Sequence, residues 1–312
     1  MGSRDLGDDM LTLPAEIAAW LLYLQPRRLQ MFWGRLIGAG LRIKGIRRAV
    51  IDQNLKIAFP GEVNEQRRRV LARAAYEHLG NLVLEIVLLF GPMPYFIRRY
   101  CRIDGKQNWL SAHAQGKGVI FISSHVGNWE IMSASGGLLG GFDLMIVTKR
   151  LKPAWLHRAI ERGRARVGVL GTYEPRTMKD VLKHLSRKGT VGFVMDQYAG
   201  PPVGVRVPVF GLPTGTPAAI AALARRTGAP VVPVVNYRNP DGRFVSEIRP
   251  ALTWKTCEDP RREIAENTAR FAANLENDIY AHPDEWLWVH RRFKGDLGPL
   301  RPEEWIEGRS RR

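Results

Sequence analysis

The chain has 312 residues, of which 45% are hydrophobic, and it carries a formal net charge of +17 at pH 7. This composition supports one large domain or two with a sizeable core, and it argues against a disordered chain. The charge indicates an anionic partner: nucleic acid, an anionic membrane surface or a phosphorylated substrate. Nine tryptophans, several beside arginine or lysine, favour the membrane interface, although tryptophan also stacks on bases.

Two further features bear on the compartment. No apolar run reaches the ~18 to 20 residues that span a bilayer, and the first ten residues are too charged for a signal peptide. The two cysteines, Cys101 and Cys257, fit no metal-ligand spacing and indicate a reducing compartment. We therefore expect a protein of the cytosol or of the cytosolic face of a membrane.

The N-terminal region is expected to be helical. Residues 12–43 form one helical pattern with an interruption at Gln25–Pro26, and aromatic and basic residues are mixed along it. That mixture is typical of an interfacial membrane anchor, and an ordinary amphipathic helix packed on the domain explains it equally well. We expect residues 1–45 to be a membrane-association segment and residues 46–312 to be one α/β domain.

Two more helices are expected before residue 100. One covers residues 47–59, and Asn64 is expected to cap another that runs to about residue 90. The apolar second half of this later helix fits a core helix better than the wall of an acyl-chain groove. At the other end of the chain, the basic tail is expected to fray.

From residue 100 onward, strands and helices alternate, which predicts an open mixed sheet flanked by helices. We expect strands at 118–123, 143–148, 190–195, 231–237 and 243–249. We expect helices at 129–138, 153–167, 175–187, 216–227 and 260–281.

The first of these strands ends in the stretch Ser123-Ser-His125-Val-Gly-Asn128-Trp-Glu130. On a regular helix His125 and Glu130 would lie about 140° apart and could not share a face. If His125 lies in the loop after the strand and Glu130 in the first helical turn, the two can meet. A carboxylate that orients an imidazole makes it a general base, and the end of such a strand is where open α/β sheets bind ligands. A histidine that merely forms loop hydrogen bonds is the alternative.

Other polar groups follow neighbouring elements of the predicted sheet. Asp196 and Gln197 come directly after an apolar strand, where Asp196 would orient the site, pair with an arginine or cap its own loop. Thr216 followed by Pro217 predicts a helix start. Backbone N–H groups near Gly127 and Asn128, or near Gly215 and Thr216, are candidates for an oxyanion site.

Basic side chains supply candidate anion sites. Arg150 and Arg164 are suited to bind phosphate or carboxylate, or they are solvated surface charges. The segment from His282 to Lys294 is dense in tryptophan, histidine and arginine. No zinc-ligand spacing, P-loop, dinucleotide fingerprint or nucleophile elbow is found in the sequence.

In this order, five stretches resemble the bacterial lipid A biosynthesis acyltransferase family, the late lauroyl- and myristoyl-type enzymes, whose fold resembles that of the glycerolipid acyltransferases. The resemblance covers the chain from about Arg48 to Lys294. It rests on Asn54-Leu-x-x-Ala58-Phe59-Pro60, Ser124-His125-x-Gly127-Asn128-Trp129-Glu130, Met195-Asp196-Gln197, Val209-Phe210-Gly211 and Pro283-x-Glu285-Trp286-x-Trp288-x-His290-Arg291-Arg292.

The resemblance implies that His125 is the general base and Glu130 its charge partner, with no metal or cofactor. The donor would be an acyl thioester on acyl carrier protein, and the acceptor a hydroxyl of a phosphorylated glycolipid. The enzyme would act on the cytoplasmic face of the bacterial inner membrane as a peripheral or monotopic protein, on its anionic surface, without binding nucleic acid. The substrate-binding residues would be Asn128, Arg150, Arg164, Asp196, Gln197 and Gly211.

Three other functions stay open from the residues themselves. The first is transfer to a different glycolipid or to an amino lipid, which the sequence does not separate from lipid A. The second is a non-enzymatic basic protein that binds membrane or nucleic acid, supported by the net charge of +17. The third is a hydrolase in which His125 activates water.

Overall fold

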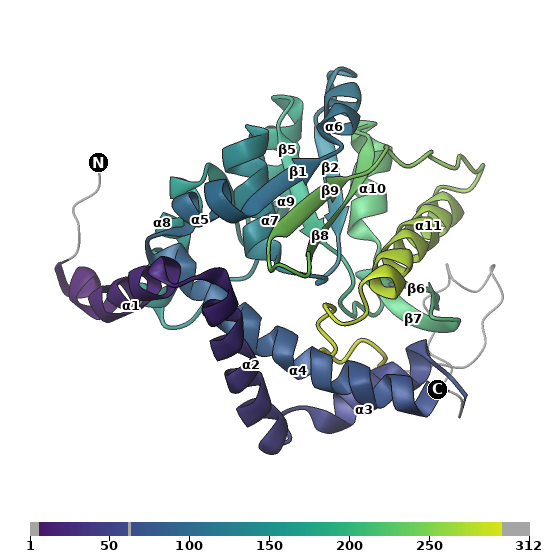
Figure 1. Ribbon diagram of the computed structural model, residues 1–312. Helices are drawn as coiled ribbons and strands as arrows, with labels where there is room; N and C mark the ends of the chain where they lie inside the picture. Colours follow the sequence, from purple (N-terminus) through teal and green to yellow (C-terminus); the bar gives the residue numbers. More distant parts are fainter. Residues whose placement is uncertain (1–5, 62–63, 295–312) are drawn as a thin grey trace.

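In the computed structural model, residues 6–61 and 64–294 are described, and they build a seven-stranded sheet with helices on both faces (Figure 1). The strand order is β1-β9-β8-β2-β5-β3-β4, and all neighbours are parallel except β8 and β9. The open mixed sheet expected from the alternating pattern is therefore confirmed. Its strands are β1 (Cys101–Asp104), β2 (Val119–Ser123), β3 (Leu144–Val147), β4 (Val169–Thr172), β5 (Thr190–Val194), β8 (Val231–Arg238) and β9 (Phe244–Ile248).

The helices divide between an N-terminal group and the two faces of the sheet. The first group is α1 (Leu6–Leu24), α2 (Arg27–Ile43), α3 (Arg48–Ala58) and α4 (Glu65–Val87), followed by a short turn, η2 (Leu88–Phe90). The sheet carries α5 (Met93–Tyr100), α6 (Lys106–His113), α7 (Trp129–Ser135) with its π-helical continuation η3 (Gly136–Gly140), α8 (Ala154–Arg166), α9 (Thr177–Ser186), α10 (Ala219–Thr227) and α11 (Pro260–Ala281).

Strand β2 is the centre of the fold because it is apolar and buried on both faces. Its side chains alternate, as in any strand. Ile120 and Ile122 pack with residues of α9, α10 and α11, whereas Phe121 packs with residues of α5, α7 and α8. Burial on both sides explains why the sequence shows a continuous apolar run there instead of an alternating pattern.

The sequence missed two edge-side strands and a hairpin. β1 and β4 are only four residues long and are not continuously apolar, so they give little pattern to recognise. A separate antiparallel hairpin pairs β6 (Gly204–Val209) with β7 (Leu212–Pro217). The expected helix start at Thr216–Pro217 is therefore wrong: both residues belong to β7, and α10 begins at Ala219.

The expected cap at Asn64 is also wrong in its chemistry. Helix α4 begins at Glu65 as predicted, but the side chain of Asn64 makes no cap hydrogen bond. Its amide instead donates to the carbonyl oxygen of Pro60 at 2.8 Å, which closes the preceding turn. The basic C-terminal tail that was expected to fray lies outside the described residues.

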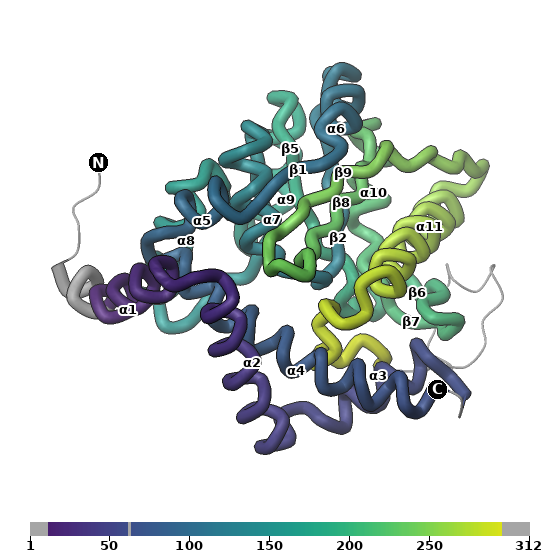
Figure 2. The backbone as a smooth tube through the Cα atoms, in the orientation of Figure 1, coloured from purple at the N-terminus to yellow at the C-terminus, as the bar shows by residue number. Residues whose placement is uncertain are grey.

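Helices α2 and α4 are neighbours in the backbone trace (Figure 2), and glycines let the two backbones come close where the helices cross. A Cβ on Gly38 would lie 2.3 Å from the carbonyl oxygen of Tyr76, and one on Gly80 would lie 2.0 Å from that of Gly34. Real Cβ atoms are not found that near to backbone oxygen, so only glycine permits this crossing.

The outer sides of α1 and α2 carry exposed apolar residues, and in α2 arginines lie between them. No helix in residues 6–61 and 64–294 combines the length and the apolar character needed to cross a membrane. We call the exposed residues the apolar N-terminal face; they are Leu13, Ile17, Trp20, Leu21, Leu24, Leu29, Phe32, Trp33, Leu36 and Ile43.

The close crossing predicts opposite effects for two nearby glycines of α2. Gly38→Ala should lower the free energy of unfolding by about 1–3 kcal/mol, because the added methyl meets backbone of α4. Gly40→Ala should raise it by about 0.5–1 kcal/mol, because nothing lies within 4 Å and alanine favours helix. Urea unfolding of both variants measures the difference, and equal shifts would contradict the packing described.

Candidate active site

Strands β2 and β5 bring His125 and Asp196 together. The two strands are parallel neighbours in which Ser123 pairs with Val194, so each functional residue follows its strand by two positions. The carboxylate of Asp196 holds the histidine twice: Oδ1 lies 2.6 Å from the ring nitrogen Nδ1, and Oδ2 accepts the backbone N–H of His125 at 2.8 Å. The carboxyl ends of adjacent strands thus build the site, as in other open α/β sheets.

The charge on Asp196 fixes which imidazole nitrogen carries the proton. Burial alone would raise the pKa of Asp196, but the charge of His125 and hydrogen bonds from His125 and Trp286 outweigh it and lower the pKa to about 2. An ionised carboxylate only accepts hydrogen bonds, so Nδ1 of His125 must be the donor. The other nitrogen, Nε2, is then free of a proton in the neutral ring, and it lies 3.3 Å from the side-chain nitrogen of Gln197.

A segment near the C-terminus completes the contacts of Asp196. The indole nitrogen of Trp286 donates to Oδ2 at 2.6 Å, and this tryptophan is buried. The same segment pairs with the loop that carries His125, because Val126 and Trp286 form an antiparallel bridge and Leu287 N–H donates to His125 C=O at 3.1 Å. This segment therefore holds the loop of His125 and the carboxylate of Asp196 in place, and we call residues 285–292 the C-terminal clamp.

Two long-range contacts hold this clamp in place. The side-chain amide of Asn54 in α3 donates to the carbonyl oxygens of Trp288 and His290 at 2.7 and 2.8 Å. The buried guanidinium of Arg292 donates to the carbonyl oxygens of Gly215 and Gln197 and to the hydroxyl of Thr216. Residues from the first, third and last of the recognised stretches therefore meet around the loop of Gln197.

Glu130 does not contact His125 in the described structure. Its carboxylate receives two hydrogen bonds from Arg164 of α8, at 3.0 Å from Nε and 2.5 Å from Nη2. The expected His125–Glu130 pair is thus corrected: Asp196 occupies the position next to the imidazole. The reason is the direction of α7, whose first turn directs Glu130 toward α8 and away from the loop of His125.

Asn128 begins α7 and connects the site to the interior. Its side-chain oxygen accepts the N–H groups of Glu130 and Ile131 at 3.0 and 3.1 Å, which caps the helix. The expected oxyanion donors in this loop are already engaged: Gly127 N–H donates to Glu285 C=O, and Asn128 N–H donates to the side-chain oxygen of Asn236. Gly127 has φ +65°, and a Cβ there would lie 2.1 Å from the carbonyl oxygen of Asn236.

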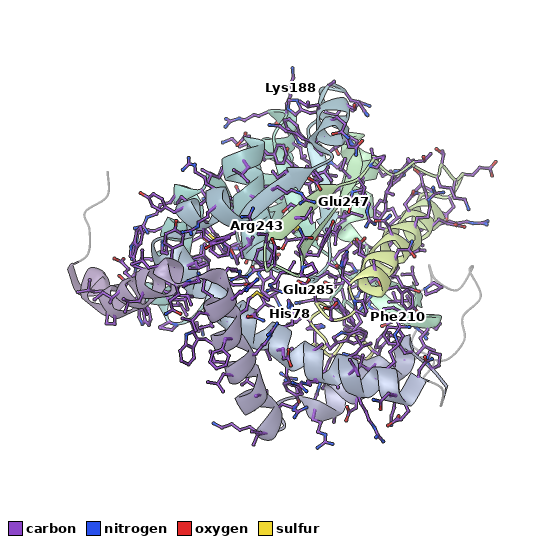
Figure 3. All side chains as sticks on the ribbon, viewed as in Figure 1. His78, Lys188, Phe210, Arg243, Glu247 and Glu285 are labelled. Carbon is purple, nitrogen blue, oxygen red and sulfur yellow. The ribbon has the colours of Figure 1, made fainter. Side chains whose placement is uncertain are left out.

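Behind Asn128 lies a buried network of charges around Glu85. One carboxylate oxygen of Glu85 accepts from the Asn128 side chain at 3.0 Å, and the carboxylate also pairs with Arg27 and Arg238. Arg238 in turn pairs with Glu285 at 2.7 Å. Figure 3 labels Glu285 in the region between α4 and the sheet. The network connects α2, α4, β8, the clamp and the active-site loop.

The electrostatics of this network favour a charged Glu85. Burial alone would raise the pKa of Glu85, but the charges of Arg238 and Arg27 and their hydrogen bonds outweigh it and lower the pKa to about 2. A buried carboxylate with these partners stays ionised, whereas one without them would be strongly destabilising.

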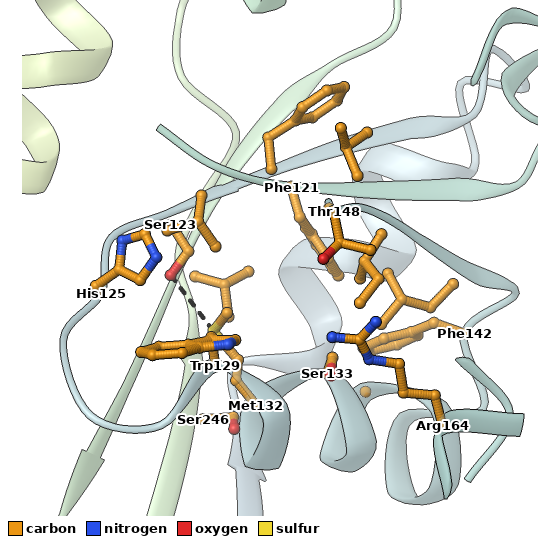
Figure 4. A pocket seen from close by; sticks show the side chains of 18 of the residues that line it. Phe121, Ser123, His125, Trp129, Met132, Ser133, Phe142, Thr148, Arg164 and Ser246 are labelled. Carbon is orange, nitrogen blue, oxygen red and sulfur yellow. Dashed lines mark hydrogen bonds between the residues drawn. The ribbon is translucent and has the colours of Figure 1, made fainter. Parts of the chain in front are cut away.

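A largely apolar cavity of about 440 Å³ opens beside His125 (Figure 4). It lies between the sheet and α7 and reaches Phe121, Leu144 and Gly192, while His125, Gln197 and Lys149 line its mouth. This volume falls within the roughly 300–1,000 Å³ of small-molecule sites. The mostly apolar lining, with His125 among its residues, suits a hydrocarbon chain.

Three other residues were expected to bind substrate: Arg164, Arg150 and Gly211. Arg164 lines the cavity, but with its charge neutralised by Glu130 and Glu161. Arg150 is exposed and lies 5.5 Å from the ring centre of Tyr173, and Lys149 lines the mouth in its place. Gly211 makes the turn between β6 and β7 at φ +74° and does not line the cavity.

The pairing of His125 with Asp196 was not predicted, although the sequence contains a signal for it. His125 and Asp196 both stand two residues beyond an apolar strand, and adjacent parallel strands place such residues together. Trp286 gave no comparable signal, because its role depends on a contact with residues 90 positions earlier. No group of three or more histidine, cysteine or acidic side chains in the described part of the chain is arranged to hold a metal ion.

Comparison with known proteins shows the family to which the chain is similar. The family described as "Bacterial lipid A biosynthesis acyltransferase" matches residues 12–295. The chain is 26% identical over 291 residues to the Lipid A biosynthesis lauroyltransferase of Escherichia coli K12, covering 93% of this chain and 90% of that protein. It is 26% identical over 282 residues to the Lipid A biosynthesis palmitoleoyltransferase of the same strain, covering 88% of each.

A more distant similarity concerns another acceptor. The Phosphatidylinositol mannoside acyltransferase of Mycobacterium tuberculosis H37Rv is 28% identical over 204 residues, covering 64% of this chain and 62% of that protein. The matches therefore include proteins named for two kinds of glycolipid.

The buried network predicts a pH-dependent loss of stability on changing Glu85. Glu85→Gln should lower the free energy of unfolding at pH 7 by roughly 3–5 kcal/mol, because two buried arginines lose a charge partner. The native pKa of about 2 lies below the usual 4.5, so the stabilisation is present above pH 4.5 and is lost as the pH falls toward about 2. The gap between wild type and variant should narrow over that range.

Chemical denaturation at several pH values measures this gap. Glu77→Gln, in the same helix α4, is the matched control: its partners Arg73 and Arg35 are exposed, so it should cost less than about 1 kcal/mol. A gap that does not change between pH 7 and pH 3 would show that Glu85 is not held ionised by its arginines.

Proposed function

The chain belongs to the bacterial lipid A biosynthesis acyltransferase family and is an acyltransferase, and we propose that it transfers a fatty acyl group from an acyl thioester to a hydroxyl of a lipid A precursor or related glycolipid. The observation that carries the proposal is the His125–Asp196 pair at the mouth of an apolar cavity. The cavity would hold the acyl chain, and the pair would activate the acceptor.

The proposed reaction begins with the acceptor hydroxyl at Nε2 of His125. This nitrogen takes the hydroxyl proton as the oxygen attacks the thioester carbonyl, and Asp196 stabilises the imidazolium that forms. The tetrahedral intermediate then collapses with cleavage of the carbon–sulfur bond. The imidazolium returns the proton to the departing thiolate, so that the products are an ester and a free thiol. The reaction uses no covalent bond to the protein.

An N–H donor is needed for the oxyanion of the intermediate. The side-chain amide of Gln197 is the best candidate, because it lines the cavity and lies 3.3 Å from Nε2 of His125. The N–H groups of Gly127 and Asn128 are unsuited to this role because other protein groups already accept them.

Glu130 would hold the site in position through its ion pair with Arg164. Its bonds to Arg164 connect α7 to α8, and Arg164 is part of the cavity wall. We assign Glu130, Arg164 and Asn128 to positioning the site, and Asp196 to the role next to the base that was expected of Glu130.

The donor would be acyl carrier protein, which is acidic, and the basic surface would favour it. Lys149 follows β3 and lines the cavity, and the exposed Arg150 is its neighbour in the chain, so both are suited to a phosphate of the donor or of the acceptor lipid. Coenzyme A thioesters fit the same chemistry, so a direct comparison of the two donors is part of the test.

The base and its partner give a prediction about rates. His125→Ala and Asp196→Asn should each lower kcat by roughly 10²–10⁴-fold, because the first removes the base and the second leaves it without its charge partner. Glu130→Gln should act mainly by weakening the contact with Arg164, and therefore lower thermal stability along with activity. The measurement is acyl transfer from acyl carrier thioester to a tetra-acylated lipid A precursor.

Thermal unfolding of each variant is the control. If Asp196→Asn keeps wild-type kcat in a folded protein, Asp196 is not the partner of the base. If thiol is released equally with and without acceptor, the protein is a hydrolase.

A second acceptor class has specific support, since a relative is named for phosphatidylinositol mannoside. Supplying lipid A precursor, mannosylated phosphoinositide and an amino lipid in parallel, with mass spectrometry of the products, distinguishes the acceptors.

We also propose that the protein binds the cytoplasmic face of the bacterial inner membrane through its apolar N-terminal face. Leu24 and Ile43 are 70% and 84% exposed, and arginines 28, 35 and 42 lie between the apolar residues. Apolar burial and attraction to anionic lipid act together in such interfacial helices.

The membrane proposal predicts a local effect of charge. Phe32→Asp combined with Leu36→Asp should lower binding to anionic vesicles at least tenfold, because each buried apolar side chain contributes roughly 1.5–3 kcal/mol. Leu110→Asp combined with Leu170→Asp is the matched control, since these leucines are 53% and 50% exposed outside α1 and α2. Co-sedimentation measures both, and equal losses would reject this face as the contact.

A further inference from the structure

Gly192 lies in the part of the sheet that lines the cavity, and it contributes no side chain there. Gly192 in β5 pairs with Phe121 of β2 on one side and with Ile146 of β3 on the other, and all three line the cavity. The other positions of these strands that line the cavity carry phenylalanine, leucine, isoleucine or valine, apart from Ser123 at the end of β2. An apolar strand in the centre of a sheet usually has no glycine, and one there often marks the close approach of another group.

The space above Gly192 is open enough for a side chain. A Cβ would meet the side chains of Ile146 and Leu144 at 3.6 and 3.7 Å and the carbonyl oxygen of Met145 at 3.9 Å, which are ordinary contacts. The fold would therefore accept alanine at this position, and any larger side chain would extend into the cavity.

Phe142 and Leu144 line the cavity near the amino-terminal end of β3. Leu144, Phe142 and Gly136 meet there, since a Cβ on Gly136 would lie 3.2 Å from Leu144 and 3.3 Å from Phe142. The opposite end is the polar mouth at His125, Gln197 and Lys149. A chain bound along the strands from His125 toward Leu144 would therefore pass Gly192.

The length of β3 sets the length of one wall of the cavity. From Leu144 to Thr148 the chain stays extended, with Thr148 N–H still bonded to Thr172 C=O, so the wall that β3 gives to the cavity is about 13 Å long at ~3.3 Å per residue. An extended alkyl chain with carbon–carbon bonds of about 1.5 Å advances roughly 1.3 Å per carbon, so on the order of ten carbons lie along this wall. Ile146, beside Gly192, lies midway.

We propose that Gly192 is the specificity-determining residue for acyl-chain length, and that it admits a saturated chain of medium length, on the order of ten to twelve carbons, past the middle of the cavity. This inference rests on the proposed acyl transfer. A side chain at position 192 would fill the part of the cavity beside Ile146 and leave the mouth, His125 and Asp196 unchanged.

The test is a graded series of variants: Gly192→Ala, Gly192→Val and Gly192→Leu. Acyl thioesters with 6 to 16 carbons are compared by kcat/KM, with each length assayed on each variant. The preferred length should fall step by step along the series. With Gly192→Leu, the twelve-carbon donor should lose roughly 10- to 200-fold for each methylene displaced from the pocket, while the six-carbon donor should stay within about threefold of wild type.

Val191→Ile is the matched control. Val191 is the neighbouring residue in β5 and packs on the opposite face of the sheet, so added bulk there should leave the preferred length unchanged. Thermal unfolding confirms that each variant is folded. If the larger substitutions fail to fold, the preferred acyl length of Gly192→Ala alone decides the test.

A second readout separates this inference from the proposed function. Binding of free fatty acids of 6 to 16 carbons, measured by calorimetry, should show the same shift in preferred length along the series. Transfer with no change in length preference across the Gly192 variants would overturn the inference and leave the proposed function standing. A shift in fatty-acid binding without any acyl transfer would support the length role of Gly192 and remove the proposed reaction.

Discussion

The candidate active site depends on one buried carboxylate, that of Asp196. Asp196 accepts three N–H groups, from the backbone and ring of His125 and from Trp286, and these bonds join the ends of β2 and β5 to the C-terminal clamp. Burial makes this arrangement costly unless every oxygen is satisfied, which is why the surrounding contacts are so complete. The clamp, the Asn54 amide and Arg292 all serve to hold those donors in position.

The cavity and His125 belong to the same face of the sheet, and the proposed reaction depends on that shared position. Alternation along β2 directs Phe121 and Ser123 into the cavity, while the loop that follows places His125 at its mouth. An apolar chain bound along the strands therefore presents its polar end where the imidazole is. The strand register thus brings together the apolar cavity and the imidazole to which we assign the proton transfer.

The sequence predicted the central strands because β2, β5 and β8 are buried apolar runs, and it predicted most helices from their periodicity. It did not predict β1 and β4, which are short and lack such a run. His125, Asp196 and Gln197 were recognised, but the partner of His125 was misassigned to Glu130. Spacing along the chain cannot show in which direction the first turn of a helix faces. The pairing with Asp196 required the order of the strands, which is a property of the whole sheet.

The network around Glu85 has an evolutionary consequence. One carboxylate serves Arg27 of an outer helix, Arg238 of the sheet and the Asn128 that begins α7. A substitution of any one of these side chains would leave a buried charge or a buried amide without its partner. In related sequences Arg27, Glu85, Arg238 and Asn128 should therefore change together or stay fixed. The sequence of α2 would then be constrained by the loop at the start of α7, to which Glu85 connects it.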